Sequence, residues 1–259
     1  MLIIKNRILP ERMNETLHFQ LLHPDQSLSD FVYCFSSLQN FSNQPQAVII
    51  PNGKVDLIFS KTVEDNFKIA LLGLETMPKY ATTEVNSFYS VSFHPLAIEY
   101  LFSDPIADLL DTGKILSSDF WNFSIADLND FEGFCTKITE KIHSILPEKI
   151  DERKRKLFQL IFSSNGEISI SELANKVFWS QRQINRYFKQ QFGLSLKSYC
   201  KIIRFQASLT HIKSGELYPK LNFTDQSHFI KEIKQFAGVS PKELHKNKND
   251  RFLQFLAYK

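Results

Sequence analysis

The chain lacks the features that mark disulfide-rich, zinc-binding and membrane-spanning proteins. Its 259 residues include only three cysteines, Cys34, Cys135 and Cys200. An odd number of cysteines with no close pair argues against a disulfide framework and against a cysteine-based zinc site. There is no run of 18 apolar residues, and the first residues contain no apolar segment typical of a signal peptide. We therefore expect a cytoplasmic protein that does not enter a membrane.

Motifs that carry catalysis are missing as well. The seven histidines are scattered, and the sequence contains no HExxH, no phosphate-binding loop and no Gly-x-Ser-x-Gly. We expect no enzyme activity, no metal site and no cofactor. Asp56 stands within an apolar run, where an edge or turn-facing carboxylate is the more usual interpretation. The alternative is a sensor pocket that Asp56 lines together with Asn52 and Lys54.

Positive and negative charges are divided unequally along the chain. Residues 1–150 contain 11 Lys and Arg against 19 Asp and Glu, a net charge of −8. Residues 151–259 contain 20 against 9, a net charge of +11. A domain with this positive charge attracts a polyanion through steering and counterion release. The acidic half would be repelled by DNA and is better suited to sensing or assembly.

Residues 1–146 are expected to form an acidic, mixed α+β domain in which a sheet is followed by helices. The apolar patterns predict strands at 47–51, 55–60, 67–74 and 89–93. In the last of these, apolar residues alternate with serines, which is typical of a half-buried strand. The stretch 24–35 fits a helix and a strand equally.

Three helices are predicted after the last of these strands. His94-Pro95 begins a short one, 105–111 suggests another, and apolar residues keep the helical period from Ile125 to Leu146. Pro147 ends that pattern, and a strongly charged run follows it. We therefore place the domain junction at about residues 146–151, with a basic helical domain over 147–259.

The stretch Ser180–Lys189, SQRQINRYFK, predicts a short helix with two different faces. Ser180 and Gln183 form a capping-box pattern, and glycine at 193 supplies a stop because it enters the left-handed conformation without a steric penalty. Ile184, Tyr187 and Phe188 fall on one side at helical spacing. The opposite side is basic and rich in hydrogen-bonding groups, with Arg182, Asn185, Arg186 and Lys189 at positions i, i+3, i+4 and i+7.

The same design returns 45 residues later without a gap. Ser180 then aligns with Asp225, Ile184 with Phe229, Arg186 with Lys231, and Gly193 with Gly238. A single such helix is equally well explained as a surface helix with solvated charges, but a repeated cap, core and stop favour a function. Two equivalent helices in one domain suit double-stranded DNA, which presents the same groove once per turn, about 34 Å apart along the helix axis.

The surrounding residues predict what connects these two helices. A helix capped by Ser169 or Ser171, followed by a tight turn into Ser180, is the order of a helix-turn-helix. Ser195 can cap a long helix that continues to about Ile212 and joins the two repeats. Ser240-Pro241 predicts a last helix, because proline is favoured at the first helical position.

The stretches ISISELANKVFWSQRQINRYFKQQFGLSLKSYCKIIRFQASL and NFTDQSHFIKEIKQFAGVSPKEL resemble the C-terminal DNA-binding domain of the AraC family of bacterial transcription regulators. The resemblance covers residues 153–246. It implies an all-α, seven-helix domain with two helix-turn-helix motifs joined by a long helix. Its third and sixth helices, at about 180–190 and 225–236, would enter adjacent major grooves of double-stranded DNA.

The resemblance also implies which residues face the DNA. Carried over by position, they are Gln181, Arg182, Asn185, Arg186 and Lys189 in the first recognition helix, and Gln226, Ser227, His228 and Lys231 in the second. Their chemistry fits, because Arg can bind guanine bidentately, Gln and Asn suit adenine, and Lys suits phosphate.

The sequence departs from the family at three positions. The family usually has glycine at the turn of each motif, where this chain has Phe178 and Asn222. Phenylalanine tolerates a left-handed conformation poorly, so a rebuilt first turn stays open. Pro219 falls where the second motif has its supporting helix, and a proline inside a helix costs about 3 kcal/mol. We therefore expect that supporting helix to be shortened.

The residues favour a sequence-specific DNA-binding transcription regulator. The rival is a protein-interaction or small-ligand-binding module whose second helix-turn-helix has degenerated, and Pro219 is the feature that separates the two hypotheses. A small-molecule effector of the N-terminal domain and a homodimer stay open as partners.

Overall fold

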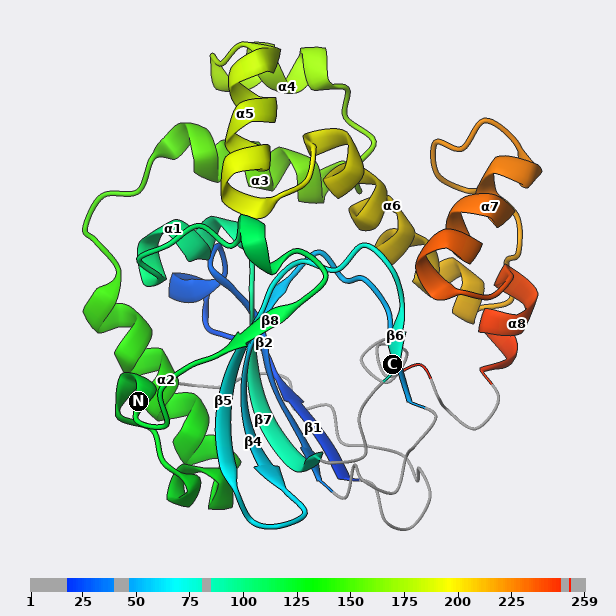
Figure 1. Cartoon of the computed structure of the whole chain (residues 1–259). Coiled ribbons are helices and arrows are strands. Elements are labelled where there is room, and N and C mark those ends of the chain that lie inside the picture. The colour runs from blue at the N-terminus through cyan, green and yellow to red at the C-terminus, as the bar shows by residue number, and fades with distance from the viewer. Residues whose placement is uncertain (1–17, 40–46, 81–84, 248–251, 253–259) are drawn as a thin grey trace.

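We describe a computed structural model of the chain for residues 18–39, 47–80, 85–247 and 252. The N-terminal half is built around a six-stranded antiparallel sheet with the order β1-β2-β7-β4-β5-β8 (Figure 1). Its strands are β1 (His18–Leu22), β2 (Val32–Gln39), β4 (Val55–Thr62), β5 (Phe67–Leu72), β7 (Val85–Phe93) and β8 (Gly113–Ile115). A second, two-stranded sheet pairs β3 (Val48–Ile49) with β6 (Lys79–Tyr80).

One face of the large sheet carries the aromatic core. Phe59 on β4 is paired with Tyr89 on β7, and both rings pack against Phe134, with ring centroids 5.2 and 5.3 Å apart. Phe134 belongs to α2 (Phe131–Ile145), which covers this face (Figure 1). The alternation that placed Tyr89, Val91 and Phe93 on one face is confirmed.

The prediction that the strand at 89–93 is only half-buried is wrong, because all five of these residues are buried. Ser90 and Ser92 point to the opposite face, yet they are only 5% and 9% exposed. They are buried because the C-terminal helices cover part of that face and enclose a cavity there. The alternating serines of β7 therefore line a pocket and do not face solvent.

The remaining N-terminal elements are short. They are η1 (Gln26–Leu28), η3 (Pro95–Ala97), α1 (Ile98–Leu101), η4 (Ala107–Leu109), η5 (Phe120–Asn122) and η6 (Ile125–Asn129). The ambiguous stretch 24–35 holds η1 and the start of β2. The helix predicted from Ile125 is interrupted at Asp130, whose extended backbone lets its carboxylate accept from the Glu132 N–H and cap α2.

The C-terminal half is helical, as expected. Its helices are α3 (Glu152–Ser163), α4 (Ile170–Val177), α5 (Gln181–Phe192), α6 (Leu196–Lys213), α7 (Gln226–Ala237) and α8 (Pro241–Lys246). Helix α6 is the long connection between α5 and α7 (Figure 1). Ser169, Ser180, Ser195 and Ser240 act as the N-caps of four of these helices.

The seven-helix arrangement implied by the resemblance needs a correction. Across the described part of this half there are six helices, and none lies between α6 and α7. Gly215, with φ +86°, follows the end of α6, and Pro219 lacks the N–H that a helix there would need. The supporting helix of the second motif is therefore absent and not merely shortened.

The two halves are packed closely together. A continuous cluster of buried apolar side chains runs from the sheet into α3, α5 and α6. At its edge, the backbone N–H of Ile106 donates to the carbonyl oxygen of Gln191, 2.9 Å away. The division of the chain at residue 146 stays a prediction.

Candidate nucleic-acid interface and pocket

The first candidate recognition helix, α5, is formed by the residues that predicted it. The Gln183 N–H donates to Ser180 Oγ at 3.2 Å, and the Ser180 N–H donates to Gln183 Oε1 at 2.8 Å, so the capping box is present. Gly193 ends the helix with φ +78°. Ile184 and Phe188 are fully buried on the inner face.

The outer face of α5 presents the candidate DNA-facing residues to solvent. Gln181, Arg182, Arg186 and Lys189 are exposed, and Asn185 is half-buried. Two of these side chains bind their own helix end: Asn185 Nδ2 donates to the Gln181 carbonyl at 3.1 Å, and Lys189 Nζ donates to the Gly193 carbonyl at 2.7 Å. For Arg182 and Arg186, no hydrogen bond or ion pair is formed with any described residue.

The turn between α4 and α5 keeps the usual handedness despite its phenylalanine. Phe178 ends α4 with φ 56° and ψ 37°, the left-handed conformation that glycine adopts more easily. Its ring is 85% exposed. The turn has not been rebuilt. The backbone of Phe178 carries the strain, and its side chain gains little from burial.

The second candidate helix, α7, has the same local design. Asp225 caps it by accepting from the His228 N–H at 2.8 Å, and Gly238 ends it with φ +73°. Phe229, Ile233 and Phe236 are buried.

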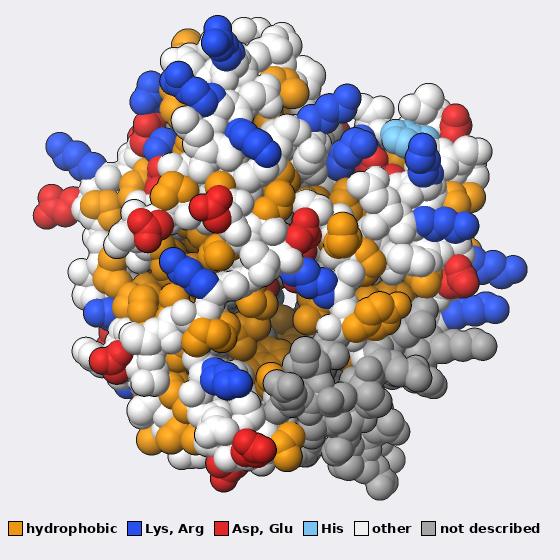
Figure 2. Space-filling model, in the orientation of Figure 1, with side chains coloured by type: hydrophobic (Ala, Val, Ile, Leu, Met, Phe, Trp, Pro, Cys, Tyr) orange, Lys and Arg blue, Asp and Glu red, His pale blue; other side chains and the backbone are white. Residues whose placement is uncertain are grey.

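Its candidate DNA-facing residues differ in how free they are. Ser227 and Lys231 are exposed, and Gln226, also exposed, donates from Nε2 to the Leu217 carbonyl at 2.9 Å. His228 is half-buried; its Nδ1 accepts from the Thr224 N–H, and its Nε2 lies 3.5 Å from Glu232. Figure 2 shows Lys and Arg side chains over the α4–α5 region and over α7 and α8.

Sequence reasoning missed two charged contacts that fix these helices. Glu99 on α1 accepts from Lys154 Nζ at 2.5 Å and from the Tyr187 hydroxyl at 3.3 Å, which ties α5 to the N-terminal half. Glu232 on α7 is 2% exposed and pairs with Arg204. The second had a signal in the sequence, because Glu232 stands at a position of the apolar stripe that carries Phe229 and Phe236.

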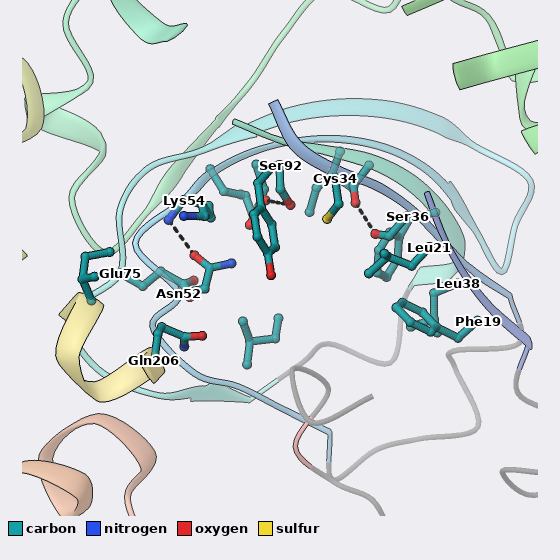
Figure 3. A pocket seen from close by; sticks show the side chains of 18 of the residues that line it. Phe19, Leu21, Cys34, Ser36, Leu38, Asn52, Lys54, Glu75, Ser92 and Gln206 are labelled. Carbon is teal, nitrogen blue, oxygen red and sulfur yellow. Dashed lines mark hydrogen bonds between the residues drawn. The ribbon is translucent and has the colours of Figure 1, made fainter. Parts of the chain in front are cut away.

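The second face of the sheet lines a cavity of about 340 Å³. Strands β2, β4 and β7 form its wall (Figure 3). The cavity is closed by Ile203 and Gln206 of α6, by Phe162 near the end of α3, and by Asn165 just beyond that end. One end is polar, with Asn52, Lys54 and Glu75, and Asp56 is hydrogen-bonded to Asn52 there. The other end is apolar, with Phe19, Leu21 and Leu38, and Phe88 is paired with Leu38 (Figure 3). Asp56 therefore lies on a central strand and lines a pocket, so the edge interpretation is wrong and the pocket alternative is right in its geometry.

The polar end holds charges that burial disfavours. Burial lowers the pKa of Lys54 to about 8, and its ammonium lies 4.8 Å from the centre of the Tyr33 ring and 4.5 Å from that of Phe162. No described residue accepts a hydrogen bond from this ammonium.

The two carboxyl groups of this end are shifted in the other direction. Burial raises the pKa of Asp56. Hydrogen bonds from Ser92, at 2.5 Å, and from Asn52 partly offset this rise. Burial likewise raises the pKa of Glu75 to about 7, although Lys79 pairs with it at 3.2 Å.

Metal and membrane features can be stated for the described residues. Among them, no group of three or more His, Cys, Asp or Glu is arranged to hold a metal ion. None of their helices combines the length and the apolar composition needed to cross a bilayer.

Comparison with known proteins agrees with the C-terminal geometry. Residues 173–247 match a family described as a helix-turn-helix domain. The Arabinose operon regulatory protein of Escherichia coli (strain K12) is 26% identical over 149 residues, which make up 55% of this chain and 50% of that protein. The chain is therefore similar to an arabinose operon regulator over about half of its own length, and its C-terminal part matches a helix-turn-helix domain. It spans about half the length of this curated relative.

The N-terminal half of the chain matches a different family. Residues 20–113 match a domain of unknown function (DUF6597). Among solved structures, ToxT from Vibrio cholerae in its P21 form is 16% identical, with a TM-score of 0.43, over 90% of this chain and 98% of that one. An unsaturated fatty acid bound wild-type ToxT of strain SCE256 is 13% identical, with a TM-score of 0.41, over 90% and 96%.

Proposed function

We propose that this chain is an AraC-like, sequence-specific DNA-binding transcription regulator in which α5 and α7 read adjacent major grooves. The observation that carries the proposal is the repeat of one design: two capped helices, each with a buried apolar face and an exposed polar and basic face, on a half with a net charge of +11. Base-edge contacts would come from Gln181, Arg182, Asn185 and Arg186 on α5, and from Gln226, Ser227 and His228 on α7. Lys189 and Lys231 suit phosphates.

The proposal divides the work between the halves. The acidic residues 1–146 would sense or assemble, and residues 147–259 would bind DNA. A homodimer through the N-terminal half fits this division, and sedimentation of the full chain at micromolar concentration measures it.

The test is selection of bound sequences from a random DNA pool with the full-length protein, followed by footprinting. Reading by both helices requires two protected major-groove segments about one helical turn, ~10 bp, apart. Lys231→Ala should weaken protection at one segment only. Lys149→Ala, an equal loss of charge at an exposed position between α2 and α3, is the matched control and should leave both segments unchanged.

The rival hypothesis makes a different forecast. If the second motif has degenerated into an interaction module, the selected sites contain one protected segment, and Lys231→Ala leaves it unchanged. If the pool yields no enriched sequence, the proposal of specific DNA binding fails altogether.

A second function, small-molecule sensing, is favoured by the pocket. Lys54 is 8% exposed and lines a cavity of about 340 Å³, a size typical of small-ligand sites. A buried ammonium without an acceptor is costly, and a ligand oxygen would relieve that cost. We propose that the occupant is a small amphipathic molecule that places a hydrogen-bond acceptor at Lys54 and its apolar part near Leu21 and Phe88.

Thermal shift with three eight-carbon probes tests this second function. Octanamide and octanoate carry an acceptor and should raise the melting temperature, whereas octylamine should not. The effect should vanish in Lys54→Met and persist in Lys61→Met, a control on the same strand with a partly exposed side chain. Equal stabilisation by octylamine, or none by any probe, would contradict the proposed occupant.

A further inference from the structure

The second motif must position its recognition helix without a supporting helix. Residues 214–225 contain no helix, so the usual partner of a recognition helix is missing in front of α7. An apolar seat remains, because Phe236 packs against Phe205 of α6 with ring centroids 5.1 Å apart. Apolar packing is non-directional, and it therefore leaves the rotation of α7 and the path of the preceding turn weakly specified.

A buried charge pair supplies the direction that the apolar seat lacks. Glu232 on α7 is 2% exposed, and its carboxylate faces Arg204 of α6. Arg204 Nε donates to Oε1 at 3.0 Å, and Nη2 donates to Oε1 at 2.7 Å and to Oε2 at 2.8 Å. Such a planar, two-pronged contact fixes both the distance and the rotation of the two groups.

The same guanidinium also holds the turn in front of α7. Arg204 Nη1 donates to the Asn222 carbonyl at 3.0 Å, and the guanidinium lies 4.7 Å from the centre of the Phe223 ring. The Asn222 N–H in turn donates to the carboxylate of Glu167, which lies in the loop between α3 and α4. The turn is thus bound from two sides, by α6 and by the loop that leads into α4.

We propose that Arg204 is a positioning residue that takes over the task of the missing helix. By binding Glu232 and Asn222 together, it sets the orientation of α7 relative to α6, and hence relative to α5. The inference rests on the proposed function, in which α7 reads a major groove. Arg204 itself is not a DNA contact in this arrangement, since its side chain is only 13% exposed and all three of its guanidinium nitrogens are donating.

Two neighbours of Glu232 cannot replace Arg204. Lys201 Nζ lies 3.8 Å from the Glu232 carboxylate, and His228 Nε2 lies 3.5 Å from it. Neither is bonded to Asn222 in the described structure. An ammonium also lacks the fork that binds two acceptors in a fixed plane.

The experiment compares full-length variants on a selected site and on the same site with its second segment scrambled. For the wild type, scrambling should weaken binding by about 10–100-fold, as the loss of one or two base pairs of specificity does. Arg204→Lys keeps the charge but loses the fork, and scrambling should then change its affinity by less than about twofold. Footprinting should show the first segment protected and the second one open.

Two further variants separate positioning from stability. Arg204→Met combined with Glu232→Leu removes the buried charges together, so the fold can be retained while the bond to Asn222 is lost. We expect a wild-type circular dichroism spectrum and again loss of the second segment only. The matched control is Lys201→Met, which removes a charge from the same helix beside the same carboxylate. The Lys201→Met protein should protect both segments.

Each outcome decides the question. Protection of both segments by the folded double variant or by Arg204→Lys overturns the inference and leaves the proposed function intact. A single protected segment in the wild type overturns both together. A third outcome is that Arg204→Lys and the double variant both lose protection of both segments together with the helical circular dichroism signal. It would show that Arg204 supports folding in general, and it overturns the positioning role.

Discussion

The Tyr199 hydroxyl donates a hydrogen bond of 3.0 Å to the carbonyl oxygen of Gly53. Tyr199 lies on α6 and is fully buried, and Gly53 lies in the turn that leads into β4. Beside it, Gln206 Nε2 donates to the Pro51 carbonyl at 2.5 Å. The turn 51–54 is therefore bound by α6, the helix that connects α5 and α7.

Tyr199→Phe should lower the free energy of unfolding by about 1–2 kcal/mol, because it removes a buried hydrogen bond and leaves the Gly53 carbonyl without that donor. Urea denaturation of the full chain measures it. Tyr218→Phe removes a hydroxyl from a residue that is 55% exposed, and is expected to change stability by less than about 0.5 kcal/mol. Equal effects of the two variants would contradict the importance of this contact.

Lys54→Met should stabilise the protein at pH 7. Burial lowers the pKa of Lys54 from 10.5 to about 8, so the native state binds this proton less tightly than the unfolded state does. The cost is fully present below pH 8 and is relieved as the pH rises from 8 to 10.5. Removing the ammonium should therefore raise the free energy of unfolding at pH 7 by about 2–3 kcal/mol.

The remaining carboxylate should tolerate this change. Ser92 and Asn52 offset the burial of Asp56 more than the charge of Lys54 does. Denaturant titrations at pH 7 and pH 10 check the prediction: the gain from Lys54→Met should shrink at the higher pH, whereas Lys61→Met should change little at either. A loss of stability at pH 7 would mean that Lys54 and Asp56 act as an indispensable ion pair.

Arg186→Ala should weaken binding to a selected DNA site by about 1–3 kcal/mol and relax one base preference. Arg186 is exposed, so the variant should fold normally. Binding assays on single-base variants of the site measure both effects. Lys114→Ala, an exposed charge on β8, is the control for net charge. Uniform weakening on all sequences would instead identify Arg186 as a phosphate contact.

Phe178→Gly should raise the free energy of unfolding by about 1 kcal/mol, because glycine adopts the left-handed conformation without the strain that other residues incur. Little burial is lost, since the ring is 85% exposed. Phe178→Ala separates the two effects: it removes the ring but keeps the strain, and should not stabilise. If both variants stabilise the protein equally, the gain comes from removing the exposed ring and not from relieving backbone strain.

Local signals predicted the C-terminal helices well. Ser180 and Gln183 act at one end of α5 and Gly193 at the other, so the bounds of α5 followed from residues at or next to its ends. Pro219 also gave a correct warning, but its effect was underestimated. The irregular chain before α7 is bound by Arg204, which lies 18 residues before Asn222 in the sequence, and a contact over this distance has no local pattern.

Long-range contacts explain what the sequence could not predict. The serines of β7 have the pattern of a solvent-exposed face. That face becomes a cavity wall because α6, more than 100 residues further along, and residues at the end of α3 cover it. Asp56 was misjudged for the same reason, since a strand's place in the sheet depends on its partners. The exposed faces of α5 and α7 were predicted as such, while their contact with DNA stays a proposal.

The fit between Gly53 and α6 has a consequence for how relatives of this chain can diverge. A Cβ atom at position 53 would lie 2.7 Å from Ile203 Cδ1, and Gly53 has φ +68°. A side chain at 53 is thus strained by this backbone conformation and must also displace the end of the Ile203 side chain, so chains that keep this packing should keep glycine at 53. Chains that keep glycine at 53 are free to keep a branched side chain at 203, and with it one wall of the cavity.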